Sequence, residues 1–205
     1  MAKLASAHVR THVVYCAVDG FRHYGLPDVT TYAQRVAEID DVAELFGCTY
    51  EILYGDKDLI EKLDTVPKRD LVDAFEGALN THRPDLLLVN SGTDYDQDHV
   101  AVFQAAFAAA RPIAPQFGKH LVPHVLTYEM SKLNWAAEPL PRSVAYTDIT
   151  HQLELKLESV RRYPTQLRPS PHIRSLESVQ ALASLRGKEI GVDYAEAFGV
   201  LRTVF

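Results

Sequence analysis

The chain has 205 residues, of which 47% are hydrophobic and 23% are charged, and its formal net charge is -6. The length suits one domain with a sizeable core, and the composition is that of an ordinary globular protein. The negative charge and the lack of a basic stripe exclude a surface built for polyanions, so no nucleic-acid partner is expected. No apolar run reaches membrane-spanning length, and the start lacks the layout of a secretory signal. We expect a cytoplasmic protein whose two cysteines, Cys16 and Cys48, are reduced and buried.

Apolar strands and amphipathic helices alternate along the first half of the chain. Short β-branched and apolar runs predict strands, and apolar residues at helical spacing predict helices. Gly47 stands where a C-terminal cap is expected, and Pro67 and Pro112 stand near the start and the end of two helices. The predicted strands are residues 11–18, 49–54 and 85–90, and the predicted helices are residues 31–46, 68–82 and the Ala-rich segment after Asp98.

The second half continues with predicted strands at residues 124–130, 143–149 and 197–204, and predicted helices at residues 150–162 and 173–187. This order predicts an α/β protein, Rossmann-like, with a mostly parallel sheet covered by helices on both faces. In such sheets ligands bind beyond the carboxyl ends of the strands. The loops after the first three strands, "DGFRHYG", "GDKD" and "NSGTDYDQDH", are therefore expected to share one rim.

The third of these loops holds three aspartates and one histidine. Asp98 is expected to be the N-cap of the following helix, which makes His99 the first helical residue. The positive end of the helix dipole disfavours a charge on that ring, so His99 is expected to be neutral and able to bind a metal. A neutral histidine among carboxylates suits zinc or a similar divalent ion. The alternative is a capped helix with an exposed histidine, and the spacing alone favours this alternative.

Other polar residues are expected near the same rim. Arg35 and Glu38 lie one turn apart on the first long helix, either as a surface ion pair or with the arginine presented to a substrate hydroxyl or phosphate. His172 and Arg174 precede a helix, and Glu129 follows the fourth strand. For Arg35 and Glu38 the spacing alone favours the surface ion pair, and an ordinary exposed or helix-capping segment is the alternative for the other residues.

Two kinds of motif are missing from the sequence. There is no G-x-S-x-G elbow for a serine nucleophile, and neither a G-x-G-x-x-G nor a Walker pattern follows any strand. Nucleotide-dependent chemistry is therefore the weaker hypothesis.

A series of segments forms an ordered pattern along nearly the whole chain. In order they are "AKLASAHVRTHVVYCAVDG", "AQRVAEIDDVAELFG", "HRPDLLLVNSGTDYDQDHVAVFQAAFAAARP", "LTYEMSKLNW", "KLESVRRYPTQL" and "HIRSLESVQALASLRGKEIGVDYAEAFGVLR". Each segment is weakly diagnostic alone, but the series resembles the LmbE/PIG-L family of metal-dependent N-deacetylases.

The resemblance implies a zinc ion held by two histidines and one aspartate, with His99 as the second histidine. In the family the other two ligands and the general base come from an Ala-His-Pro-Asp-Asp-Glu signature after a first strand. Residues 1–205 contain no such signature, and they begin inside the helix that follows it in the family. His8 and His12 fall where the family has the end of that helix and the turn into the second strand, so the resemblance assigns them no ligand role. Asp96 stands where other branches often have histidine.

Two explanations of this gap are open. Either the printed start is too late, or the protein is a degenerate relative that completes its sheet in another way. We expect the first, because the remainder keeps the family's pattern and Met1 falls in mid-helix. Residues 1–205 are accordingly expected to form a single, N-terminally incomplete domain whose sheet lacks its first strand.

The resemblance implies a metal-dependent hydrolase that removes an acetyl group from an N-acetylated amino sugar or its conjugate, inactive in the chain as printed. The implied residues are His99 as a ligand of zinc, Asp98 and His172 in catalysis, and Asp19, Arg35, Glu129 and Arg174 in substrate binding. The alternative is a non-catalytic relative that binds a sugar-like ligand or a partner. The expected ligand is a small amino-sugar conjugate, and whether the protein is a homo-oligomer stays open.

Overall fold

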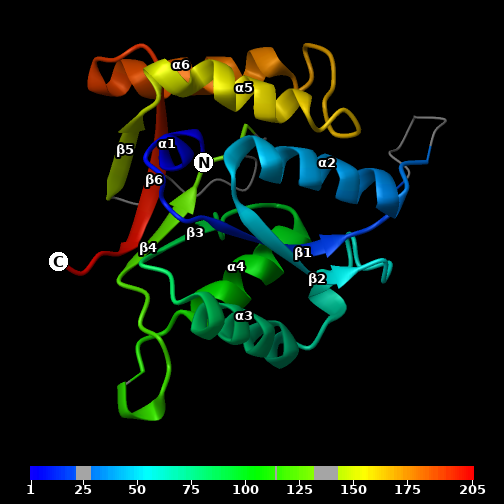
Figure 1. Ribbon diagram of the computed structural model, residues 1–205, viewed down its shortest axis with the longest axis vertical. Helices are drawn as coiled ribbons and strands as arrows, with labels where there is room; N and C mark the ends of the chain where they lie inside the picture. The colour runs from blue at the N-terminus through cyan, green and yellow to red at the C-terminus, as the bar shows by residue number, and fades with distance from the viewer. Residues whose placement is uncertain (22–28, 114, 132–142) are drawn as a thin grey trace. The chain divides into compact units, whose positions relative to one another are not determined.

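The computed structural model describes residues 1–21, 29–113, 115–131 and 143–205. The chain divides into two compact units, one mainly of Met1–Ile60 and Tyr146–Glu196 and the other mainly of Glu61–Met130 and Ala197–Phe205 (Figure 1). No described helix is both long enough and apolar enough to cross a membrane.

The first unit is built on a parallel pair of strands. β1 (His12–Val18) and β2 (Thr49–Gly55) lie in register, with Val18 opposite Gly55, so the two strands end together. α2 (Tyr32–Phe46) packs on both strands. Its buried residues, Ile39, Val42 and Phe46, recur at helical spacing and form the apolar face that this packing requires.

Local sequence sets both ends of α2. The Thr31 side chain accepts a hydrogen bond from the Gln34 N–H, and the Gln34 side chain accepts one from the Thr31 N–H, which is a capping box. Gly47 ends the helix in the left-handed conformation, with φ of 59°. The predicted cap at Gly47 is therefore confirmed.

The remaining helices of the first unit form a second layer of packing. Apolar residues of α5 and α6 meet around Leu153, Leu157 and Ala183, and the two helices lie side by side (Figure 1). Ser175, which is 1% exposed, caps α6 by accepting a hydrogen bond from the Ser178 N–H. The helical elements other than α2 are α1 (Ala2–Ser6), η3 (Thr150–Gln152), α5 (Leu153–Arg161) and α6 (Leu176–Ile190).

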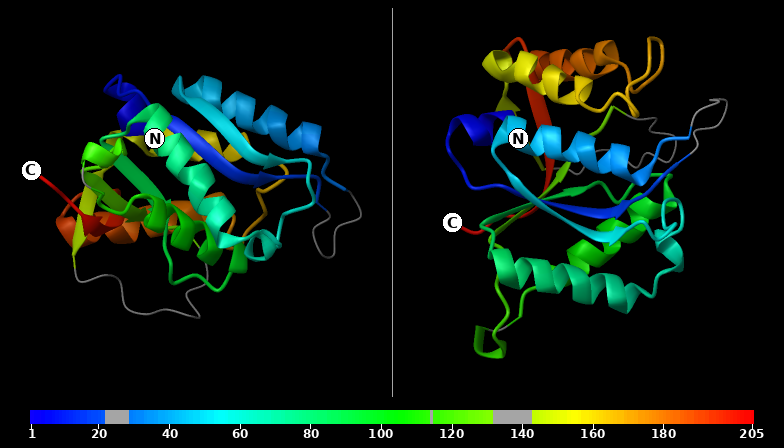
Figure 2. Two further views of the ribbon diagram at one scale, coloured as in Figure 1. Left: turned by 90° about the horizontal axis from the view of Figure 1, so that it is seen from below. Right: turned by 45° about the vertical axis from the view of Figure 1, so that its right-hand side comes forward.

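The second unit contains a larger, mixed sheet. Its strand order is β3-β4-β6-β5, with β3 and β4 parallel and β4 and β6 antiparallel. α4 packs on β3 and against α3, as two views show (Figure 2). The elements are η1 (Leu63–Thr65), α3 (Lys68–His82), β3 (Leu86–Asn90), α4 (Gln97–Ala109), η2 (Pro115–Phe117) and β4 (His124–Tyr128), together with β5 (Val144–Asp148) and β6 (Ala195–Arg202), which each have residues in both units.

These elements confirm the predicted α/β class and almost every predicted strand and helix. One difference is that the strands described here form two sheets rather than one. Residues 1–11 hold α1 and no strand, as expected from the resemblance. Cys16 and Cys48 are both thiols rather than a disulfide, as predicted, but they are half-buried rather than fully buried. Residues 22–28, in the first predicted rim loop, and 132–142 lie outside the described residues.

An ion cluster holds the segment after α4 against α3. Glu76 of α3 lies 2.7 Å from the Arg111 Nη1 and also contacts the Lys119 ammonium group. Burial alone would raise the pKa of Glu76, but the hydrogen bond from Lys119 and the charge of Arg111 outweigh it and lower this pKa from its ordinary value of 4.5.

Two helical glycines give a matched test of packing. A Cβ at Gly187 of α6 would lie 2.6 Å from the Asp193 carbonyl oxygen, whereas a Cβ at Gly77 of α3 would meet nothing within 4 Å. Gly187→Ala is expected to lower the free energy of unfolding by about 1–3 kcal/mol through overpacking. Gly77→Ala is expected to raise it by about 0.5–1 kcal/mol, because alanine is the better helix former. Urea denaturation measures both, and equal effects of the two changes would contradict this packing.

The Glu76 cluster predicts a pH-dependent stability. A carboxylate whose pKa is lower in the folded state than in the unfolded state stabilises the fold at pH values above its unfolded pKa. This stabilisation is lost as the pH falls through the folded pKa. Glu76→Gln is therefore expected to lower the free energy of unfolding by about 1 kcal/mol near neutral pH, and by progressively less below the ordinary pKa. Denaturation across this pH range measures the difference. Asp73→Asn, which changes a 62% exposed carboxylate of the same helix, is the control. A deficit that persists in acid would contradict the ion-pair explanation.

Candidate metal centre and ligand-binding residues

In the second unit, polar residues follow two parallel strands at the end of the sheet where both strands finish. Asn90 and Tyr128 are opposite each other at the ends of β3 and β4, so the loop after Asn90 and the residue Glu129 leave the sheet from the same edge. The loop after β3 and the residue after β4 therefore lie beyond the carboxyl ends of these two strands, as expected. Glu129 lies there half-buried, and its role in substrate binding stays a prediction.

The start of α4 differs from the prediction by two residues. The N-cap is Asp96, whose Oδ1 accepts a hydrogen bond from the Asp98 N–H at 3.0 Å, and the helix begins at Gln97. The prediction that Asp98 is the N-cap was therefore wrong, and His99 is the third helical residue rather than the first. Either aspartate is a good cap by type, and the backbone choice between two residues so close depends on tertiary contacts that the sequence does not show.

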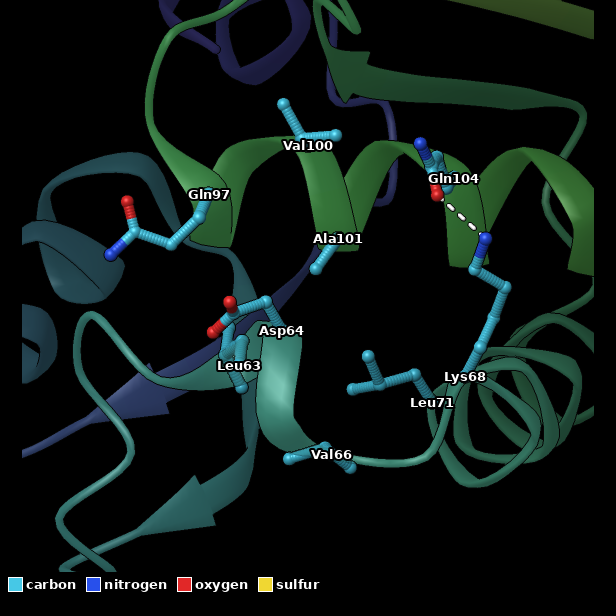
Figure 3. A pocket seen from close by; sticks show the side chains of 9 residues that line it. All are labelled: Leu63, Asp64, Val66, Lys68, Leu71, Gln97, Val100, Ala101 and Gln104. Atoms are coloured by element: carbon cyan, nitrogen blue, oxygen red, sulfur yellow. Dashed lines mark hydrogen bonds between the residues drawn. The ribbon is translucent and has the colours of Figure 1, made fainter.

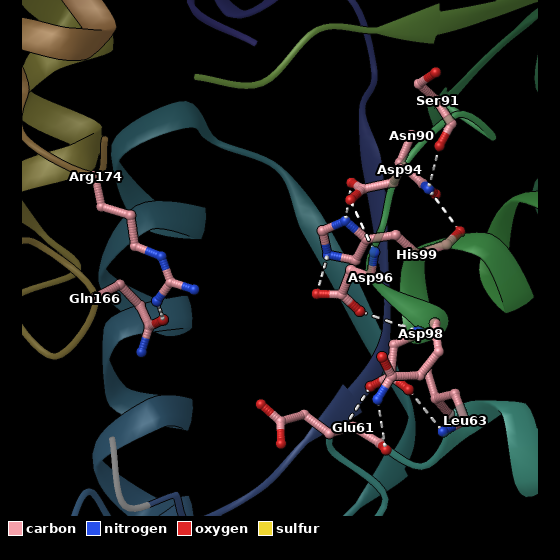
Figure 4. A network of polar contacts seen from close by, with 11 residues as sticks. Glu61, Leu63, Asn90, Ser91, Asp94, Asp96, Asp98, His99, Gln166 and Arg174 are labelled. Carbon is pink, nitrogen blue, oxygen red and sulfur yellow. Dashed lines mark hydrogen bonds and ion pairs between the residues drawn. The ribbon is translucent and has the colours of Figure 1, made fainter. Parts of the chain in front are cut away.

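His99 lies between two carboxylates of its own loop (Figure 4). Its Nδ1 is 2.6 Å from the Asp94 Oδ2, which is hydrogen-bond distance, and its Nε2 is 3.8 Å from the Asp96 Oδ2. The second distance is too long for a hydrogen bond. Two ligand atoms at about 2.0–2.2 Å from one zinc ion are separated by about 3.3–3.6 Å in tetrahedral geometry. His99 Nε2 and Asp96 Oδ2 could therefore hold one divalent ion together after a small shift.

The chemistry of this donor pair fits the implied metal. Imidazole nitrogen and carboxylate oxygen are ligands that zinc accepts, and they accept other divalent ions as well. The His99 side chain is 34% exposed and that of Asp96 is 31% exposed, so both can be reached from solvent. The two side chains supply part of a coordination sphere.

Asp98 is a connecting residue in the structure. Its carboxylate accepts hydrogen bonds from the Glu61 N–H at 2.6 Å and from the Leu63 N–H at 2.8 Å (Figure 4). Burial raises the pKa of Asp98, and these two hydrogen bonds oppose that rise. Gln97 adds a hydrogen bond to the Glu61 carbonyl at 3.1 Å. Asp98 thus fastens the start of α4 to the segment before α3, and its catalytic role stays a prediction.

Asn90 is a site residue that the sequence reasoning missed. It is 4% exposed, and its Nδ2 donates to the His99 carbonyl oxygen at 2.7 Å and to the Ser91 carbonyl oxygen at 3.1 Å. The end of β3 is therefore tied to the same turn that carries the His99 ring. The available signal was an amide residue closing an otherwise apolar strand, "LLLVN".

A cavity of about 390 Å³ lies between η1, the start of α3 and α4 (Figure 3). Its floor is mainly apolar, and a hydrogen bond of 2.6 Å joins Lys68 Nζ to Gln104 Oε1 at its side. None of the predicted site residues lines it. The lining residues are Leu63, Asp64, Val66, Lys68, Leu71, Gln97, Val100, Ala101 and Gln104.

In the first unit, Asp19 follows β1 and is 9% exposed. Its Oδ1 accepts a hydrogen bond from the Gly20 N–H at 2.7 Å, and its Oδ2 accepts one from the Asp58 N–H. The loops after β1 and β2 thus meet, as the predicted rim requires. Asp19 holds these two loops together, and its contact with substrate stays a prediction.

Arg35 lies in the first turn of α2 and is mostly buried, with 19% of its side chain exposed. Its Nε is 3.8 Å from the Glu38 Oε2, and within the described residues this buried N–H has no hydrogen-bond acceptor. Glu38 instead accepts from the Thr165 N–H at 2.7 Å and from the Thr165 hydroxyl at 2.6 Å. Burial lowers the pKa of Arg35, and Glu38 opposes this. The pair is therefore not a simple surface ion pair, and a buried donor without an acceptor suits a ligand oxygen.

His172 and Arg174 form a turn before α6. The His172 Nδ1 accepts a hydrogen bond from the Arg174 N–H at 3.0 Å, and the Arg174 Nη1 donates to the Gln166 Oε1 at 3.1 Å (Figure 4). Both residues are exposed. The positive charge of Arg174 is near enough to contribute to the lowered pKa of Arg35. The catalytic role of His172 and the substrate contact of Arg174 stay predictions.

The fold and the histidine–carboxylate loop define an α/β protein with a candidate divalent-metal centre at the start of a helix. No protein-family model matches the chain, and no curated protein matches it. Solved structures do match over nearly its whole length. One is the N,N'-diacetylchitobiose deacetylase from Pyrococcus horikoshii, with a TM-score of 0.66 and 22% identity over 98% of this chain and 76% of that chain.

Two further solved structures match at least as closely in fold. A deacetylase of the teicoplanin biosynthesis pathway has a TM-score of 0.71 and 15% identity over 97% of this chain and 89% of that chain. GalB, the 4-carboxy-2-hydroxymuconate hydratase from Pseudomonas putida KT2440, has a TM-score of 0.71 and 19% identity over 100% of this chain and 89% of that chain. At such identities the likeness is one of fold. The predicted resemblance to LmbE/PIG-L-type deacetylases is confirmed at that level.

The contacts of Asp98 predict the effect of removing its side chain. Asp98→Ala is expected to speed hydrogen exchange at the Glu61 and Leu63 amides, because both lose their acceptor. The Asp70 amide, which donates to the Pro67 carbonyl, is the internal reference and should not change. Amide exchange followed by NMR makes the measurement. Unchanged protection at Glu61 and Leu63 would show that Asp98 does not fasten this segment.

Proposed function

We propose that the protein is a metal-dependent hydrolase that removes an acetyl group from an N-acetylated amino sugar or its conjugate. The observation that carries this proposal is the placement of His99. Its ring lies between Asp94 and Asp96 at the start of α4, in a fold shared with solved deacetylases. The resemblance found in the sequence assigns a metal to the same histidine.

His99 Nε2 is the proposed metal ligand in the described part of the chain, with Asp96 Oδ2 beside it. A zinc ion bound here would lower the pKa of a water molecule and polarise the acyl oxygen. The neighbouring residues position this metal ligand. Asn90 and Asp98 hold the backbone of the loop in place, so that the His99 ring meets the metal without first ordering a flexible segment.

Substrate recognition is proposed for the first unit. The buried Arg35 Nε–H would donate to a hydroxyl or an anionic oxygen of the sugar conjugate, which would satisfy a donor that has no acceptor among the described residues. Asp19, Arg174 and Glu129 are proposed as further substrate contacts, and His172 is proposed to assist near the departing amine. The single-domain organisation and the cytoplasmic location belong to this proposal.

A second candidate is a non-catalytic protein that binds a sugar-like ligand. It is supported by the low sequence identity to the solved deacetylases, 22% and 15%, at which the likeness is one of fold. The hydratase in the same fold also shows that the fold does not dictate deacetylation. Metal binding and acetate release separate these candidates, because a non-catalytic protein would bind ligand without producing acetate.

His99→Ala is expected to abolish stoichiometric zinc binding, since the variant loses the nitrogen ligand that the described residues supply to the proposed centre. Elemental analysis of the purified protein measures the zinc content. His151→Ala, which removes an exposed histidine of the first unit, is the control and should leave the zinc content unchanged.

Activity is measured as acetate released from N-acetylglucosamine and from N,N'-diacetylchitobiose. The zinc-loaded 205-residue chain is assayed beside a longer chain that carries any in-frame residues encoded upstream. Release is expected from a chain with a complete metal centre, with a loss of at least about 100-fold in the His99→Ala variant of that chain. No acetate from either chain, together with measurable sugar binding, would favour the non-catalytic candidate.

A further inference from the structure

Asp94 is the less exposed of the two carboxylates that contact the His99 ring. Only 6% of its side chain is exposed, against 34% for His99 and 31% for Asp96. Its Oδ1 accepts a hydrogen bond from the Asp96 N–H at 3.1 Å, and its Oδ2 lies 2.6 Å from the His99 Nδ1. The backbone contact fixes the direction of the carboxylate, so the contact with the ring is preset by the loop.

The chemistry of this contact determines where the ring carries its proton. An ionised carboxylate has only acceptor oxygens, so the nitrogen facing it must be the donor. In a neutral imidazole only one nitrogen carries a hydrogen. A proton on Nδ1 therefore places the lone pair on Nε2. That is the atom that faces Asp96 and that a metal would bind.

A second carboxylate competes for the opposite arrangement. Asp96 Oδ2 is 3.8 Å from the His99 Nε2, and a small movement of either side chain would bring the two within hydrogen-bond distance. If Nε2 carried the proton, Asp96 would accept it and the metal-binding lone pair would be lost. Asp94 lies 2.6 Å from its ring nitrogen and Asp96 lies 3.8 Å from the other, a difference of 1.2 Å, and Asp94 is also more buried. The interaction of the ring with Asp94 is therefore the stronger of the two.

We propose that Asp94 is the positioning residue that sets the tautomer and the orientation of the His99 ring, leaving the Nε2 lone pair for a divalent metal. The effect of Asp94 on metal binding rests on the proposed function, whereas the tautomer of the His99 ring can be measured without a metal. Carboxylates that orient ligand histidines in this way typically alter metal affinity by about 10–100-fold when they are removed. Asp94 was not among the residues selected from the sequence for a specific role.

Long-range proton–nitrogen NMR of the full 205-residue chain, without metal, tests the tautomer directly. The wild type is expected to carry its ring proton on Nδ1 of His99. Asp94→Ala is expected to shift the ring toward the Nε2-protonated form, and Asp94→Asn, which keeps an acceptor oxygen at the same place, is expected to restore part of the wild-type tautomer. Asp96→Asn keeps a good N-cap residue and should leave the proton on Nδ1. Unchanged backbone amide spectra establish that each variant is folded.

Calorimetric titration with Zn²⁺ then separates this inference from the proposed function. Asp94→Ala is expected to weaken zinc binding by about 10–100-fold, with a smaller loss in Asp94→Asn. A wild-type ring protonated on Nε2, or wild-type tautomer and zinc affinity in Asp94→Ala, would overturn the role of Asp94. A tautomer that follows Asp94 in a wild-type protein that binds no zinc would support the role of Asp94 and overturn the proposed function.

Discussion

The side-chain hydrogen bonds that hold the start of α4 are the constraint on which the candidate site depends. Asn90 ties the His99 carbonyl to the end of β3, and Asp98 ties the same turn to the segment before α3. Both side chains act on backbone groups, which places the His99 ring without using the ring itself. The imidazole is thereby left to interact with Asp94 and Asp96.

The fold could be predicted from the sequence because its signals are local. Apolar runs such as "LLLVN" and the spacing of Ile39, Val42 and Phe46 report burial directly, and Gly47 marks a helix end by its conformational freedom. The site could be predicted only as a loop. The partner of Asp98 is the Glu61–Leu63 backbone, more than thirty residues earlier, and no local pattern encodes such a contact. The same applies to Glu38, which accepts hydrogen bonds from Thr165 in addition to its 3.8 Å ion pair with Arg35.

The neighbours in structure show that this fold supports more than one reaction. Deacetylases and a hydratase share its arrangement of strands and helices with TM-scores of about 0.7 to this chain. Hydrolysis of an amide and hydration both add water to an unsaturated centre, so a metal-binding loop could serve either reaction. What separates the two reactions is the set of groups that face the substrate, and the fold alone does not determine that set.

The two contacts of Asp98 also constrain the length of the backbone that they span. One carboxylate oxygen accepts from the Glu61 amide and the other from the Leu63 amide, with Lys62 between them. Adding or removing a residue at this point would change the separation of the two amides, and one oxygen of Asp98 would lose its donor. This turn can therefore vary in the side chain of residue 62 but not in length, and a peptide tag or a loop graft would be poorly tolerated there.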